Sequence, residues 1–185
     1  MKEKKEIPSL MDVAGWMAIP LGIVWSASFL CTMYGTTQPL LSMLGTILGV
    51  GSIFLLRRQL ANYRKLYPEA IWLQVFRIAF VTCLLAGLLT DAVQYAYFAL
   101  FDNGRLLTQL GTAFQSEEYR EVWQKMMPGT NLDEMQKLVQ SMTVRDIMTQ
   151  LVFYNIILAL PVSLLASIGV KAPQNPQKTG TNSNR

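Results

Sequence analysis

Hydrophobic residues gather into four long stretches that carry almost no charge. Residues 13–35 and 36–56 contain no charged side chain, and neither does 147–170, while 70–101 contains only Arg77 and Asp91. A helix that crosses a bilayer needs about 20 mainly apolar residues, each adding about 1.5 Å of rise. The pattern therefore predicts four transmembrane helices, at residues 13–34, 38–56, 71–98 and 147–170. A retained first helix, bent at Pro20, is favoured over a cleaved signal peptide because its apolar residues continue through Met33.

The composition agrees with a membrane protein. Of the 185 residues, 51% are hydrophobic and only 15% are charged, whereas a soluble domain carries about 25% charged residues. We therefore predict an all-α fold, an integral membrane four-helix bundle.

Basic residues are distributed unequally between the two sides of this predicted bundle. The segment "RRQLANYRKLYPE" at 57–69 contains Arg57, Arg58, Arg64 and Lys65, and with the two chain ends it holds ten of the sixteen Lys and Arg residues. Residues 102–146 contain five basic residues against seven acids. Cytoplasmic segments collect Lys and Arg, so the asymmetry predicts an N-in/C-in topology. No basic stripe is interleaved with aromatic residues, so we expect no nucleic-acid partner.

This topology divides the chain into five parts. They are a cytoplasmic N-terminus (1–12), spans 1–3 with a basic cytoplasmic loop at 57–69 (13–101), a periplasmic amphipathic segment (102–146), span 4 (147–170) and a disordered cytoplasmic tail (171–185).

The periplasmic segment has a helical apolar pattern. Leu106, Leu107, Leu110 and Phe114 share one face, and a second apolar face follows after a break at Pro128–Gly129, with Thr130 and Asp133 as a helix start. We predict an amphipathic helical hairpin on the outer side, which could lie on the outer leaflet, cap the bundle or bind a partner. Its methionines suggest Cu(I) only weakly, because ordinary packing explains their helical spacing.

Small residues recur along the first two predicted spans. In the second span they are Ser42, Gly45, Gly49 and Ser52, and in the first they are Ala18, Gly22 and Ser26. Such stripes let helix backbones approach closely in lipid. The short uncharged connection makes the two helices antiparallel neighbours, so we expect the stripes to face each other; a homodimer contact is the alternative use.

Four polar residues within the spans fall at similar predicted depths: Asp91, Gln94, Asn155 and Ser26. Polar side chains in lipid usually face the bundle interior. We therefore predict one inward-facing polar layer. Interhelical hydrogen bonding is the favoured role, and an ion or proton site on Asp91 and a position of Asp91 at the outer interface are the alternatives.

Several chemistries have no support in the sequence. The chain contains no His, its two cysteines (Cys31 and Cys83) fit packing better than a disulfide, and no glycine-rich phosphate loop ends in Lys-Ser/Thr. We expect no catalytic residue, no metal site and no cofactor.

One resemblance covers residues 10 to 170. Short spans are followed by the basic turn with Tyr63-Arg64, an aromatic and apolar third span, "YAYFALFD" at its outer end, an amphipathic segment and a last span. This succession resembles the small four-span membrane proteins of Bacteroidetes-type bacteria known as domain of unknown function 4199. The resemblance implies an inner-membrane location and no particular substrate.

Two functions remain open. The favoured one is a non-enzymatic structural or accessory protein that presents the outer hairpin to an envelope partner, because the hairpin is too long for a simple connector. The alternative is a small oligomeric transporter or channel that uses the polar layer around Asp91. An enzyme is disfavoured, and the expected partners are the lipid bilayer, an envelope protein or further copies of the chain.

Overall fold

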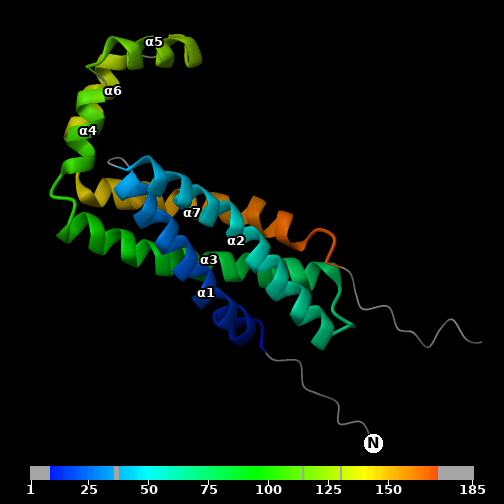
Figure 1. The fold of residues 1–185 in the computed structure, drawn as a ribbon. Coiled ribbons are helices and arrows are strands. Elements are labelled where there is room, and N and C mark those ends of the chain that lie inside the picture. Colours follow the sequence, from blue (N-terminus) through cyan, green and yellow to red (C-terminus); the bar gives the residue numbers. More distant parts are fainter. Residues whose placement is uncertain (1–8, 36–37, 114, 130, 171–185) are drawn as a thin grey trace, which may run out of the picture. The chain divides into compact units, whose positions relative to one another are not determined.

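The fold is all α-helical in the part of the chain that the structure describes. The computed structural model describes residues 9–35, 38–113, 115–129 and 131–170, which form seven helices and no strand (Figure 1). Their bounds are α1 Leu10–Gly35, α2 Pro39–Leu66, α3 Trp72–Leu100, α4 Arg105–Ala113, α5 Glu117–Met126, α6 Leu132–Ser141 and α7 Val144–Ser167.

Four of these helices are long and apolar enough to cross a membrane. The best windows of α1, α2, α3 and α7 have mean hydropathies of 1.6, 2.0, 1.9 and 1.8. Large apolar side chains such as Leu40, Ile47 and Phe54 of α2 are nevertheless exposed. Exposed apolar surface on this scale is expected where the surrounding solvent is lipid. The prediction of four membrane-spanning helices is confirmed at this level, and the chain has the architecture of a multi-pass membrane protein.

The second helix is longer than predicted. The expected cytoplasmic loop at 57–69 is wrong in its first ten residues, because α2 continues as helix to Leu66. The reason is a buried stripe at helical spacing, formed by Leu56, Leu60 and Tyr63. Arg57 and Arg58 therefore lie on the solvent-exposed side of a continuous helix, and the true loop is residues 67–71.

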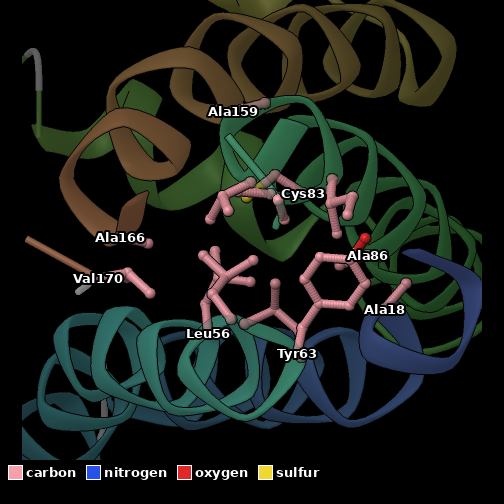
Figure 2. Packing of buried hydrophobic residues seen from close by; sticks show 14 residues of the cluster. Ala18, Leu56, Tyr63, Cys83, Ala86, Ala159, Ala166 and Val170 are labelled. Atoms are coloured by element: carbon pink, nitrogen blue, oxygen red, sulfur yellow. The ribbon is translucent and has the colours of Figure 1, made fainter. Parts of the chain in front are cut away.

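The described residues belong to two compact units, Met1–Thr90 with Asn155–Arg185 and Asp91–Tyr154. The apolar core of the first unit draws on all four long helices. Figure 2 shows Leu56 and Tyr63 of α2 pointing into a cluster that includes Ala18, Cys83 and Ala86. Cys83 is fully buried there, as its expected packing role requires. Alanines supply much of the rest of this core, so the helices can pack with little side-chain bulk between them.

The second unit contains the three short helices α4, α5 and α6. The prediction of a two-helix hairpin is wrong here, since the first predicted helix is divided at Ser116, whose side chain caps the N-terminus of α5. The structure packs α4 against α6. Phe114 and Thr130 lie outside the described residues, as do the predicted disordered tail 171–185 and most of the N-terminus.

Candidate functional site

The small-residue stripe of α2 faces α1. A Cβ atom added to Gly45 would lie 2.6 Å from Thr32 Oγ1 and 2.8 Å from the Ser28 carbonyl oxygen. Ser28 Oγ donates a hydrogen bond to the carbonyl of Gly45 at 2.7 Å. Only glycine permits this approach, and the resulting backbone contact allows a polar bond between two apolar helices.

The line of close contacts between the α2 stripe and α1 forms a seam, and two further contacts extend this seam toward the end of α2. Gly49 lies near Ser28, with 3.2 Å between an added Cβ and Ser28 Oγ. One turn on, Trp25 Nε1 donates to Ser52 Oγ at 2.8 Å, and Ser52 Oγ donates to the Gly49 carbonyl at 2.6 Å. The four stripe residues Ser42, Gly45, Gly49 and Ser52 thus lie along the α1–α2 pair, where the chain itself occupies the surface that a homodimer would need. At the start of the pair, Ser42 atoms lie within 2.7 Å of a Cβ added to Gly35.

The first helix uses different residues from those expected. Gly22 lies against α3, because an added Cβ would be 3.0 Å from Leu89 Cβ and 3.3 Å from the Ala86 carbonyl oxygen. Ser26 is half-buried on α1. Trp25 and Ser28 of α1 form hydrogen bonds with the α2 stripe. The expectation that Gly22 faces the stripe is therefore wrong: Gly22 marks a second close helix contact, with α3.

Two of the basic residues used for topology also meet the end of α7. Arg64 donates from Nη1 to the carbonyl oxygen of Val170. Arg57 Nη2 lies 3.0 Å from a Cβ added to Gly169, whose φ of +73° ends the helix. Guanidinium groups at a helix C-terminus stabilise its exposed carbonyls and its dipole. Arg58 and Lys65 are exposed. No local pattern in the sequence indicates the contacts of Arg57 and Arg64 with α7.

The third helix carries the largest share of buried polar side chains. Its most apolar window is 44% buried, against 11–22% for the other long helices. Within α3, Thr82, Thr90, Asp91 and Gln94 are all buried, with Asp91 only 8% exposed and Gln94 6%. Gln94 Oε1 and Thr82 Oγ1 accept no hydrogen bond within the described residues. Buried polar groups of this kind are costly in lipid, which makes α3 the chemically distinctive helix.

Asn155 approaches α3 one turn before Asp91. A Cβ added to Gly87 would lie 3.5 Å from the Asn155 Cβ, and Gly87 and Asp91 are four residues apart on the same helix face. The buried hydroxyl groups of four further residues are not predicted from the sequence; these residues are Thr82, Thr90, Ser163 and Ser167. The predicted polar layer stays a prediction. Ser26 and Asn155 belong to the first compact unit, whereas Asp91 and Gln94 belong to the second.

The short helices carry surface chemistry of a different kind. Ser116 accepts from the backbone N–H of Tyr119, and Asn131 caps α6 in the same way through Asp133 and Glu134. Arg120 and Asp133 form an ion pair at 2.8 Å between α5 and α6. Apolar side chains remain exposed nearby, namely Val122, Met126, Met127 and Leu138. The described residues contain no cluster of His, Cys, Asp or Glu suited to a metal ion.

Comparison with known proteins gives a family and no activity. Neither the curated proteins nor the solved structures contain a match to this chain. The model of one family, described as "Protein of unknown function (DUF4199)", matches residues 17–168. That range includes all four long helices and all three short ones, apart from the first turns of α1. The chain therefore belongs to the DUF4199 family.

Proposed function

We propose that this protein is a non-enzymatic accessory protein of the bacterial inner membrane that presents α4, α5 and α6 to a partner in the periplasm. The chain crosses the membrane four times in this account, with both termini in the cytoplasm. The bilayer is its first partner and an envelope protein its second.

The charge distribution and one hydrogen bond support the proposed topology. Arg57, Arg58, Arg64 and Lys65 all lie at the C-terminal end of α2, which is the arrangement of a cytoplasmic helix end. The bond from Arg64 to Val170 joins this end of α2 to the C-terminal end of α7. Four complete crossings bring these two ends to the same side of a membrane.

The observation that carries the proposal is the combination of order and exposed apolar surface in α4–α6. This segment has side-chain helix caps and an ion pair, so it is a folded structure and not a simple connector. Val122 and Met126 lie one turn apart on α5 and are 48% and 64% exposed. An ordered apolar face of this kind is typical of a surface that another protein or a membrane covers.

A photo-crosslinking experiment tests this proposal. A benzoylphenylalanine residue replaces Val122 in one variant and Gln124 in a control. Both positions are exposed on α5, and two residues of helix separate them by about 200° around the axis. We expect one protein adduct of defined mass from position 122 and none from position 124. The same adducts from both positions, or lipid adducts alone from position 122, would contradict a partner on this face.

The buried polar residues of α3 favour a second candidate, a small oligomeric transporter or channel. Asp91 and Gln94 are buried within a helix long enough to span a membrane, and intramembrane carboxylates often serve ion or proton pathways. Ion or proton flux in liposomes that contain only the purified protein would support this candidate. Asp91→Asn should then abolish the flux while Glu121→Gln, an exposed carboxylate on α5, retains it. Absence of flux in the unaltered protein would eliminate the candidate.

A further inference from the structure

A cleft between α1 and α2 has no role in the proposed function. It has a volume of about 480 Å³ and lies where α1 begins and α2 ends, within the first compact unit. Asp12 and Trp16 line it from consecutive turns of α1. From α2 come Gln59, Asn62 and Tyr63 at helical spacing, and Tyr67 lines the cleft from the position directly after the helix. The cleft is thus built from one face of each helix.

The polar groups of the cleft favour a ligand that donates hydrogen bonds and carries positive charge. The lining contains one carboxylate and two carboxamides, and no Lys or Arg. Gln59 Oε1 is buried and accepts no hydrogen bond within the described residues. A buried acceptor without a donor costs about 1–3 kcal/mol, which a ligand N–H group would recover once the Gln59 amide turns toward the cleft. Ser9 Oγ donates to Asp12 Oδ2 at 2.6 Å and fixes the carboxylate beside the cleft.

The aromatic lining points to the same ligand chemistry. Trp16 is 79% exposed, so its ring is accessible, and the rings of Tyr63 and Tyr67 lie with their centroids 5.0 Å apart. Ammonium groups bind favourably over the faces of such rings. Trp and Tyr are also the residues that collect at the level of lipid headgroups.

The surroundings of the cleft match the rest of a phospholipid. Arg58 and Lys65 are exposed and lie four residues before and three residues after Asn62, so both lie beside Asn62 along one edge of the lining face of α2. Both are suited to a phosphate. Ile19 and Ile23 of α1 are exposed on the following turns, toward the apolar middle of the helix, where an acyl chain would lie.

We propose that this cleft binds the headgroup of phosphatidylethanolamine, with the primary ammonium received by Asp12, Gln59 and the aromatic side chains. Arg58 and Lys65 contact the attached phosphate. A quaternary ammonium would satisfy the aromatic rings but has no N–H to donate to Gln59 Oε1 or Asp12. The cleft should therefore distinguish ethanolamine from choline lipids.

The test is lipid binding to the purified full-length protein in detergent, measured by native mass spectrometry. Short-chain phosphatidylethanolamine, phosphatidylcholine and phosphatidylglycerol are titrated in parallel. We expect the ethanolamine lipid to bind about tenfold more tightly than the choline lipid, as one charge-assisted hydrogen bond allows. Asp12→Asn and Gln59→Met should each remove this preference. Glu69→Gln should retain it, since Glu69 is an exposed carboxylate in the loop after α2 and does not line the cleft.

Three results would overturn the proposal. Equal binding of the ethanolamine and choline lipids would show that N–H donors are not recognised, and a preference for phosphatidylglycerol would show that Arg58 and Lys65 dominate. Free phosphoethanolamine that binds as tightly as the lipid would identify a site for a soluble amine. If Gln59→Met does not fold, Asp12→Asn decides, because the amide oxygen of asparagine can still accept the hydrogen bond from Ser9 Oγ at the start of α1.

Discussion

The α1–α2 pair and the α4–α6 segment differ in where their polar and apolar contacts lie. In the α1–α2 pair, glycine brings two backbones together, and hydrogen bonds such as Ser28 to Gly45 lie between helices whose outer surfaces are apolar. In α4–α6 the polar contacts lie at exposed positions, as side-chain caps and the Arg120–Asp133 ion pair. Apolar side chains cover only one face of each short helix.

This difference matches the solvent that the proposed topology gives to each region. Lipid offers no hydrophobic drive for helix association, so close contact and shielded polar bonds must hold α1 and α2 together. Water competes with surface hydrogen bonds and ion pairs, which contribute little each, so α4–α6 depends on its apolar face being covered. Substitutions in the α1–α2 pair should therefore be much more damaging than substitutions among the surface contacts of α4–α6.

The largest effect is expected at Gly45. Gly45→Leu would place a side chain against the Ser28 carbonyl oxygen, which belongs to the helix backbone and cannot move aside cheaply. We expect a loss of about 3 kcal/mol in the free energy of unfolding, the upper range for overpacking. Thermal unfolding in mild detergent measures it.

Gly51→Leu is the matched control for this change. Gly51 lies on the same helix, and a Cβ added there meets nothing within 4 Å. Its unfolding temperature should be unchanged or slightly raised, because leucine favours helix more than glycine does. Similar losses at positions 45 and 51 would mean that the seam does not hold the two helices together.

A smaller effect is expected at the junction between α2 and α7. Arg64→Met removes the hydrogen bond to the Val170 carbonyl and leaves the end of α7 without this cationic partner. We expect a loss of about 2 kcal/mol, as for a hydrogen bond to a charged group. The exposed Lys65→Met removes the same charge from the same segment and should cost almost nothing. Equal losses would indicate that net charge matters here and the contact with α7 does not.

The smallest effect is expected in α4–α6. Arg120→Gln breaks the ion pair with Asp133, and both side chains are at least 36% exposed. We expect a loss of about 0.5 kcal/mol, in the range for surface ion pairs, and a smaller loss at high salt. A loss as large as that of Gly45→Leu would show that this segment also depends on shielded polar contacts.

The four long helices can be predicted from the sequence because they depend on patterns within one helix, and the α2 stripe is a pattern of the same local kind. Apolar length identifies the spans, and the three- and four-residue spacing of Ser42, Gly45, Gly49 and Ser52 identifies a contact face. Leu56, Leu60 and Tyr63 are also spaced three and four residues apart, and this helical spacing indicates that α2 continues beyond Arg57. The charged residues of this segment indicate a loop, whereas the helical spacing of its apolar residues indicates that the helix continues.

Contacts between helices that are distant in the sequence could not be predicted in this way. Gly22 lies against α3 because the rotation of α1 is set by two neighbours, and a pattern within α1 does not say which one a small residue meets. The bond from Arg64 to Val170 joins residues 106 positions apart, and no local signal connects them. The polar residues of α3 stand out in the sequence because their surroundings are apolar, but their hydrogen-bond partners depend on packing.

The most direct test of the proposed topology is the accessibility of two introduced cysteines to a membrane-impermeant thiol reagent. Cys31 and Cys83 are first replaced by alanine, and Gln124→Cys on α5 or Glu69→Cys in the loop after α2 is then introduced; both positions are exposed. If α4–α6 is periplasmic and the basic end of α2 is cytoplasmic, position 124 is labelled in intact spheroplasts and position 69 only after lysis. Labelling of position 69 in intact spheroplasts, or of position 124 only after lysis, would contradict the account.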